Sequence, residues 1–133
     1  MSTQVISIDP YYPESEKIAY AAKIIRQGGL VVFPTETVYG IGADMNNKKA
    51  IARLREVKKR AEDKPFSILI SHVNQLSNLT NYDNPVLFKM IDQYWPGPLT
   101  VIVPAKEDGQ TVGIRMPDHA VALNMVKESQ SEK

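Results

Sequence analysis

Residues 28–44 place a short apolar strand directly before a polar loop, and this stretch limits the possible folds more than any other part of the chain. Residues 30–33 form the strand, which Pro34 breaks because proline has no backbone N–H to donate. The loop then carries two threonines, a glutamate and a tyrosine before Gly40 and Gly42. Loops held by a rigid sheet commonly present binding groups, and glycines let a backbone turn sharply or approach a ligand closely. The stretch therefore predicts a binding loop at the end of a strand.

A basic segment follows at residues 48–60. It contains seven basic residues and one acidic residue, whereas the whole chain has a formal net charge of only +1. Ile51, Leu54 and Val57 recur at helical spacing, so the segment is predicted to be a helix with a basic end. On charge alone, such a run is most often a solvated helix end that complements the helix dipole. A local positive patch can also steer an anion, so both interpretations stay open at this point.

Hydrophobic spacing and turn residues predict strands and helices along the rest of the chain. Strands are expected at residues 5–8, 30–33, 66–70, 99–103 and 111–115, the last two as an antiparallel pair. Helices are expected at residues 13–27, 48–60, 84–94 and 120–128, the first one stopped by Gly28 and Gly29. This order predicts an α/β fold of the mixed α+β kind, with a twisted mixed parallel and antiparallel sheet flanked by helices.

The third of these helices has the clearest boundaries. Asn84 and Pro85 suit its N-cap and first turn. Residues 95–98, Trp-Pro-Gly-Pro, end it abruptly and are interpreted as a rigid turn that aims the next strand. The apolar face of this helix is expected to hold Leu87, Met90, Ile91 and Tyr94.

Composition excludes several classes of protein. The chain has 133 residues, 43% of them apolar and 23% charged, which indicates one globular domain. The absence of cysteine excludes a disulfide framework and a thiolate metal site. No apolar run approaches the roughly 20 residues that span a bilayer, and residues 1–9 do not resemble a secretory signal. We therefore expect a cytoplasmic protein with no membrane partner. His72 and His119 are isolated in sequence and predict no metal site.

Four blocks of the sequence, in the same order along the chain, resemble the YrdC domain family of threonylcarbamoyl-adenylate synthases. They are PTETVYGIGAD at 34–44, KKR followed by KP within 58–65, YWPGPLTVIV at 94–103 and TVGIRMPDH at 111–119. The resemblance implies one YrdC-like domain over residues 1–133 that is incomplete at its C-terminal end. Relatives continue with a further strand and a Ser-Ala-Asn loop at the nucleotide site.

The resemblance also implies a reaction. Threonine, bicarbonate or carbon dioxide, and ATP would give L-threonylcarbamoyl-adenylate and pyrophosphate, for the threonylcarbamoyl-adenosine modification of tRNA with partner proteins. ATP is then a substrate, Mg²⁺ is expected to accompany it, and no side chain is assigned as a metal ligand. Phosphoryl transfer depends mainly on positioning and charge stabilisation rather than on a protein nucleophile.

Site residues are implied by their positions in the matching blocks. Lys58 and Arg60 are the expected catalytic and nucleotide-binding cations, and Thr111 is expected near the nucleotide. Thr35 and Arg115 are expected to bind the threonine substrate, since the planar fork of an arginine suits a carboxylate. Each has a structural alternative: a solvated helix end for the basic pair, a turn hydroxyl for Thr35, a strand-end arginine for Arg115 and an ordinary strand residue for Thr111.

Two other functions remain open from the sequence. One is a module that binds double-stranded RNA or tRNA through the basic segment, although a near-neutral chain is unusual for a nucleic-acid binder. The other is an inactive ligand-binding remnant of the family. Neither Glu36 nor Asp44 is assigned as a metal ligand. Within the polar loop, Glu36 is expected to orient neighbouring groups. Tyr39 could stack on a ligand ring or pack in the core.

Overall fold

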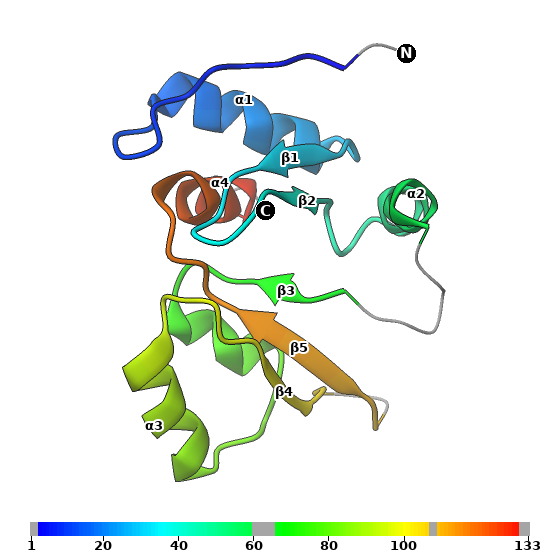
Figure 1. Cartoon of the computed structure of the whole chain (residues 1–133). Helices are drawn as coiled ribbons and strands as arrows, with labels where there is room; N and C mark the ends of the chain where they lie inside the picture. The colour runs from blue at the N-terminus through cyan, green and yellow to red at the C-terminus, as the bar shows by residue number, and fades with distance from the viewer. Residues whose placement is uncertain (1–2, 60–65, 107–108, 131–133) are drawn as a thin grey trace.

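The computed structural model describes residues 3–59, 66–106 and 109–130, and it is a mixed α/β fold as predicted (Figure 1). The helices are α1 (Ser15–Arg26), α2 (Lys48–Lys58), the 3₁₀-helix η1 (Val73–Asn78), α3 (Pro85–Tyr94) and α4 (Ala120–Gln130). The strands are β1 (Val31–Phe33), β2 (Gly40–Gly42), β3 (Ile68–Leu69), β4 (Val101–Pro104) and β5 (Thr111–Arg115). No helix in the described ranges is both long and apolar enough to cross a bilayer.

The strands form two sheets rather than the single sheet that was predicted. β1 and β2 are an antiparallel pair, and the second sheet has the order β3-β5-β4. In it β3 is parallel to β5 and β4 is antiparallel to β5, which confirms the mixed directions and the antiparallel pair. Figure 1 shows β1, β3 and β5 running the same way, so their carboxyl ends lie on one side of the molecule. The loop between β1 and β2 lies on that side too, whereas α2 lies on the opposite side.

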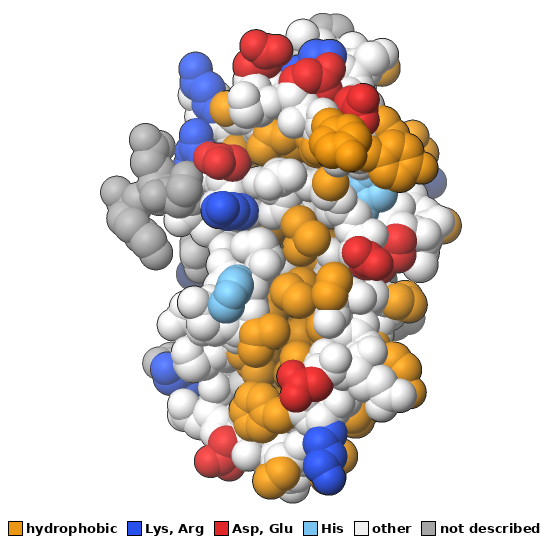
Figure 2. All heavy atoms as spheres, turned by 90° about the vertical axis from the view of Figure 1, so that its left-hand side faces the viewer, with side chains coloured by type: hydrophobic (Ala, Val, Ile, Leu, Met, Phe, Trp, Pro, Cys, Tyr) orange, Lys and Arg blue, Asp and Glu red, His pale blue; other side chains and the backbone are white. Residues whose placement is uncertain are grey.

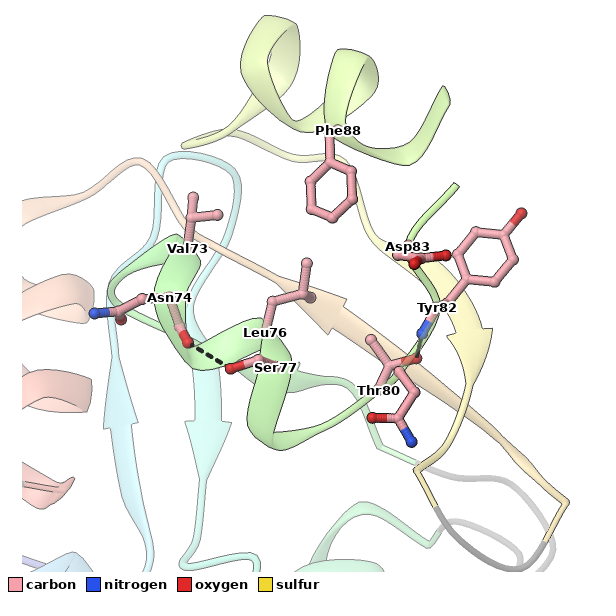
Figure 3. Close-up of a pocket in the computed structure, with 9 residues that line it drawn as sticks. Val73, Asn74, Leu76, Ser77, Thr80, Tyr82, Asp83 and Phe88 are labelled. Carbon is pink, nitrogen blue, oxygen red and sulfur yellow. Dashed lines mark hydrogen bonds between the residues drawn. The ribbon is translucent and has the colours of Figure 1, made fainter. Parts of the chain in front are cut away.

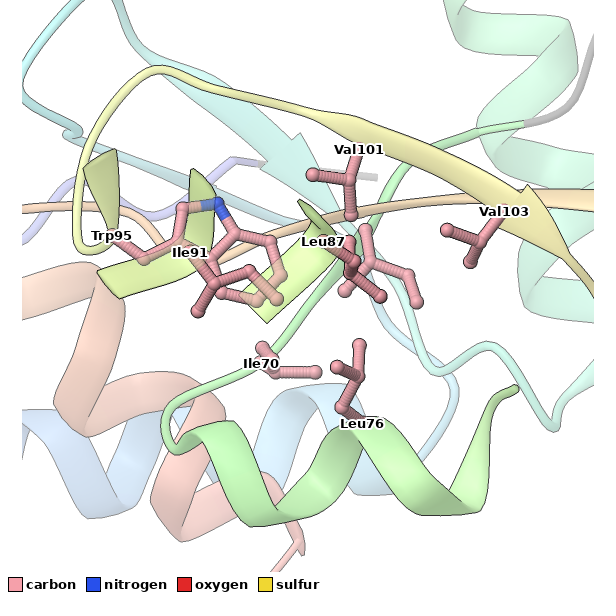
Figure 4. Packing of buried hydrophobic residues seen from close by; sticks show 8 residues of the cluster. Ile70, Leu76, Leu87, Ile91, Trp95, Val101 and Val103 are labelled. Atoms are coloured by element: carbon pink, nitrogen blue, oxygen red, sulfur yellow. The ribbon is translucent and has the colours of Figure 1, made fainter. Parts of the chain in front are cut away.

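One face of the three-stranded sheet packs against α3 and η1, and their buried side chains form the larger core cluster (Figure 4). Strand alternation explains this arrangement. Val101 and Val103 of β4 are buried while Ile102 is exposed, and Ile114 of β5 is completely buried. The residues at positions 111, 113 and 115 therefore lie on the other face of β5. The members of the cluster are Ile70, Leu76, Leu87, Ile91, Trp95, Val101, Val103 and Ile114.

A smaller core cluster lies near β1, α1 and α4. It contains Phe33, Ala122 and Met125, with Val31 and Leu69 packed against it. Helix α1 packs mainly against α4, and Arg26 donates a hydrogen bond to the Glu128 carbonyl. These contacts place α4, which follows β5, against α1 and against Phe33 at the end of β1.

The two glycines of the polar loop pack in a strand and do not form the sharp turn expected from the sequence. Gly40 and Gly42 belong to β2, where they lie beneath the ring of Phe33. A Cβ at Gly42 would lie 3.0 Å from Phe33 Cε1, and one at Gly40 would lie 3.2 Å from Phe33 Cζ. Neither has a positive φ angle. Because Phe33 is buried, its ring has little freedom to move away from an added methyl group.

Replacing Gly42 with alanine is expected to lower the free energy of unfolding by about 1–3 kcal/mol, the usual cost of overpacking a core. Urea unfolding followed by circular dichroism measures it. A second change, Phe33→Leu, makes room for the methyl group, so the double variant should lose less stability than the sum of the two single losses. Strictly additive losses would show that the ring and the methyl group do not collide.

Several predicted boundaries are confirmed. The Asn84 side chain accepts a hydrogen bond from the Val86 N–H at 2.9 Å, with Pro85 in the first turn of α3. Gly28 has φ +89°, which explains why α1 ends there. The basic helix ends at Lys58 instead of residue 60, because Lys59 adopts a left-handed conformation as its C-cap. Strand 111–115 has the predicted bounds.

Other predictions were wrong. Residues 5–8 form no strand: most of the segment is exposed, and it runs beside α1, where Lys17 Nζ donates to the Ser7 carbonyl at 2.5 Å. Strand 66–70 is reduced to Ile68–Leu69, because only this part pairs with β5. Met90 and Tyr94 do not share the buried face of α3, since they are 39% and 49% exposed. The 3₁₀-helix η1 was not predicted.

Candidate active site

The hydroxyl of Thr35 forms hydrogen bonds to the backbone within the loop after β1. Thr35 Oγ1 donates a hydrogen bond to the Val38 carbonyl and accepts one from the Thr37 N–H at 3.2 Å. The structural role considered for this threonine is therefore observed, and the loop that carries it is ordered by its own contacts. Tyr39 is 74% exposed, so it does not pack in the core.

Arg115 ends β5 and is fixed by two hydrogen bonds from its guanidinium group. Its Nε donates to the Gly97 carbonyl at 3.1 Å, and its Nη2 forms an ion pair with Glu36 Oε1. The second oxygen of Glu36 accepts a hydrogen bond from the Asp118 N–H at 2.9 Å. The side chains of Arg115 and Glu36 are only 17% and 21% exposed. This Glu36–Arg115 network joins the loop after β1 to the end of β5 and to the segment before α4.

Gly97 helps to hold Arg115 in place, which the sequence did not predict. It lies in the turn after α3, where its N–H donates to the Met116 carbonyl at 2.9 Å while its own carbonyl accepts from Arg115. A Cβ here would lie 2.4 Å from the Tyr94 carbonyl oxygen, so only glycine fits. Trp95 Nε1 anchors the same turn by donating to the Leu99 carbonyl at 2.8 Å. A glycine between two prolines was the sequence signal, but nothing in it indicated a contact with Arg115.

The structure brings Thr35 and Arg115 together, since Glu36 is the chain neighbour of one and the ion-pair partner of the other. Thr111 begins β5 and is exposed. It lies on the same face as Arg115 but roughly 13 Å away, because four residues of a strand cover about that length. Lys58 is exposed at the end of α2, on the side of the molecule where β5 begins (Figure 1). Arg60 lies outside the described residues.

The remaining polar candidates have local structural roles. His72 Nδ1 accepts from the Asn74 N–H and His119 Nδ1 from the Val121 N–H, so each caps a helix. Asp44 Oδ1 accepts from the Asn46 N–H in the turn before α2. Among the described residues no group of three or more His, Cys, Asp or Glu side chains could hold a metal ion.

A hollow of about 400 Å³ lies elsewhere, between η1 and the beginning of α3 (Figure 3). Leu76, Thr80, Tyr82 and Phe88 are among the residues that line it, and none of the expected site residues does. Figure 2 shows a band of apolar side chains along the side of the molecule that carries the carboxyl ends of β1, β3 and β5. Acidic and basic side chains both lie beside this band and gather at its upper end in the view, so neither sign of charge dominates this face.

The fold and the Glu36–Arg115 network define a mixed α/β domain with a polar cluster at the carboxyl ends of its strands. A comparison with protein families identifies it further. The Sua5/YciO/YrdC family model, described as telomere recombination, matches residues 23–131. The chain belongs to this family, which confirms the resemblance seen in the four sequence blocks.

Curated relatives with similar sequences are named threonylcarbamoyl-AMP synthase. The chain is 40% identical to that of Bacillus subtilis over 122 residues, which cover 85% of this chain and 35% of the relative. It is 39% identical to that of Pyrococcus abyssi, over 88% of this chain and 37% of the relative. For the Coxiella burnetii protein the identity is 37%, over 81% and 62%. The chain therefore spans between about a third and three fifths of the length of these relatives.

Solved structures agree with these matches. The crystal structure of P. abyssi Sua5 complexed with L-threonine has a TM-score of 0.86 and 38% identity, and the match covers 95% of this chain and 40% of that one. Escherichia coli YciO has a TM-score of 0.88 and 25% identity, over 96% of this chain and 66% of YciO. The mixed α/β fold is thus the fold of the Sua5 and YciO structures.

Proposed function

We propose that this chain carries the threonine-binding part of an L-threonylcarbamoyladenylate synthase. The observation that supports this most is its likeness to the Sua5 structure complexed with L-threonine, at 38% identity over 95% of the chain. The geometry is compatible with this role, because a half-buried arginine lies beside a polar loop at the carboxyl ends of the strands. Ligands of open α/β sheets commonly bind at such an edge.

The proposed reaction assigns a task to each expected site residue. Arg115 pairs with the carboxylate of threonine, and the Thr35 loop contacts the rest of the amino acid. The threonine amine adds to carbon dioxide and loses a proton, giving a carbamate. A carbamate oxygen then attacks the α-phosphorus of ATP, forming threonylcarbamoyl-AMP and releasing pyrophosphate. Lys58, Arg60 and Thr111 bind the nucleotide, where the two cations stabilise the charge on the phosphates.

The two groups of residues suit a ligand that extends along β5. The loop after β1, which carries Thr35, lies on the side where β5 ends with Arg115, and α2, which ends at Lys58, lies on the side where β5 begins with Thr111 (Figure 1). An amino acid would then bind at one end and a nucleotide at the other. Mg²⁺ would enter with ATP and be held mainly by phosphate and water oxygens. We place the reaction in the cytoplasm, with tRNA and tRNA-modification proteins acting on the product.

A second candidate function is supported by the exposed helix α2. Its sequence carries Lys48, Lys49, Arg53, Arg55 and Lys58, and the helix lies on the side of the molecule opposite the carboxyl ends of β1, β3 and β5 (Figure 1). This arrangement favours a surface that contacts tRNA or double-stranded RNA phosphates. Binding that weakens steeply with salt and that occurs without threonine or ATP would support this candidate over the enzyme.

The proposed enzyme is tested by measuring ligand binding and pyrophosphate release with the same preparation. We expect calorimetry to detect L-threonine but not L-threoninol, which lacks the carboxylate.

We also propose that residues 1–133 supply only part of the nucleotide surface, because the chain spans 35% of its B. subtilis relative. Pyrophosphate release should then be about a hundredfold or more below that of the relative, since small misplacements cost this much. Pyrophosphate release at the relative's rate would refute the partial-site proposal, and no threonine binding would refute the function.

A further inference from the structure

We propose that Glu36 is a positioning residue of the amino-acid site, which holds Arg115 and the Thr35 loop in a fixed relation and leaves a free edge of the guanidinium group for a ligand carboxylate. This inference rests on the proposed threonine-binding function. The inference adds Glu36 to the residues of the amino-acid site. Glu36 itself is not expected to contact threonine, and it acts by holding Arg115 and the Thr35 loop in place.

The first support is that both oxygens of Glu36 are used, and by different segments. Oε1 pairs with Arg115 Nη2, 79 residues away, and Oε2 accepts from the Asp118 N–H, 82 residues away. The side chain is 21% exposed, so these contacts are only partly open to competing water. One carboxylate thus fixes the loop after β1 against both the end of β5 and the segment that leads into α4.

The second support is that only some of the N–H donors of Arg115 have hydrogen-bond partners. A guanidinium group has five N–H donors. Nε is committed to the Gly97 carbonyl and one Nη2 hydrogen to Glu36, and the guanidinium group makes no other hydrogen bond or ion pair within the described residues. The Nη1 group and the second Nη2 hydrogen are therefore left for another acceptor. One Nη1 hydrogen and a neighbouring Nη2 hydrogen can together form an edge of the planar fork, and such an edge binds a carboxylate with two parallel bonds.

The same contacts argue against a simpler role, in which Glu36 only occupies the place of the ligand until the ligand displaces it. Displacement would have to remove Glu36 from Arg115 while its other oxygen remains bonded to Asp118 N–H. It would also free the loop that carries Thr35, so the two proposed contacts to the amino acid would no longer be held together. The two roles predict opposite changes in threonine affinity when Glu36 is removed.

The test measures L-threonine binding by calorimetry for the full 133-residue chain and for Glu36→Ala and Glu36→Gln. We expect Glu36→Ala to weaken binding by about tenfold to a hundredfold, the range for a misaligned charge-assisted hydrogen bond. Glu36→Gln keeps one acceptor oxygen, so it can replace only one of the two contacts and should give an intermediate affinity. The matched control is Glu16→Gln, an exposed acid in the first turn of α1, which should bind threonine like the unchanged chain.

Circular dichroism reports whether each variant is folded, and affinities are compared for folded protein only. If Glu36→Ala does not fold, the lower affinity expected of Glu36→Gln decides the test. Threonine affinity that is unchanged in the folded variants, even if they melt at lower temperature, would reduce Glu36 to a structural role and overturn the inference. Tighter binding by Glu36→Ala would overturn it in favour of displacement. No threonine binding by the unchanged chain would overturn the proposed function itself.

Discussion

Replacing Trp95 with alanine is expected to lower the free energy of unfolding by about 3–5 kcal/mol, the cost of removing a large buried aromatic side chain. Trp95 is 7% exposed and lies in the larger core cluster, beside Ile91 of α3 (Figure 4). Its Nε1 also donates to the Leu99 carbonyl, which would lose this partner. Domains of this size are commonly stable by only about 5–15 kcal/mol, so the variant should be close to unfolding at 37 °C.

Urea unfolding followed by far-ultraviolet circular dichroism measures this loss, because Trp95 is the only tryptophan and its fluorescence disappears with it. Trp95→Phe keeps most of the apolar volume and loses the hydrogen bond, so its cost should be smaller. Val86→Ala in the first turn of α3 is the matched control, since Val86 is 61% exposed and should change stability by less than about 0.5 kcal/mol. A loss below that of the control would mean that Trp95 does not support this core.

Replacing Arg115 with alanine is expected to have two effects. It should lower the free energy of unfolding by about 1–3 kcal/mol, because the Gly97 carbonyl and one oxygen of Glu36 lose their partner in a partly buried place. It should also weaken threonine binding by about tenfold or more, through loss of the charge-assisted contact to the carboxylate. Arg115→Lys should retain only part of the stability and part of the threonine affinity, since a lysine ammonium cannot reproduce the planar fork.

The stability effect is separated from the binding effect by a double-mutant cycle with Glu36→Ala. Removing Glu36 as well takes away the unpaired carboxylate, so the double variant should be more stable than the two single losses predict when added. Lys89→Ala on α3 is the matched control for binding, because Lys89 is an exposed cation outside the network. Additive losses, or threonine binding equal to that of the Lys89 variant, would contradict the assigned role of Arg115.

The elements that the sequence predicted well are those whose signals are local. Asn84 caps α3 with its own side chain two residues away, and Gly28 ends α1 by its left-handed conformation. The bounds of β5 follow from the alternation of Val112 and Ile114 between polar or small neighbours. Four short motifs in order were sufficient for the family, because each combines turn residues and polar groups that rarely occur together by chance.

The candidate site was predicted only in part. Thr35 and Arg115 were both selected, but the residue that joins them was expected merely to orient its loop, and Gly97 was treated as part of a turn. Segment 5–8 has a strand-like pattern and yet pairs with no strand in the part of the chain that the structure describes, since a strand needs a partner that the local pattern does not contain. The packing role of Gly42 was not predicted, because its sequence neighbours do not reveal that the ring of Phe33 lies against it.

The sequence by itself determined the mixed α/β class, the family, most helix ends and the identity of the chemical groups available to the site. Only the tertiary structure decided which of those groups meet. Caps, turns and alternation depend on residues within a few positions of one another, whose backbone angles and hydrogen bonds are set locally. The ion pair of Glu36 with Arg115 spans 79 residues. It therefore forms only once two sheets and α4 have packed and brought those segments to the same edge.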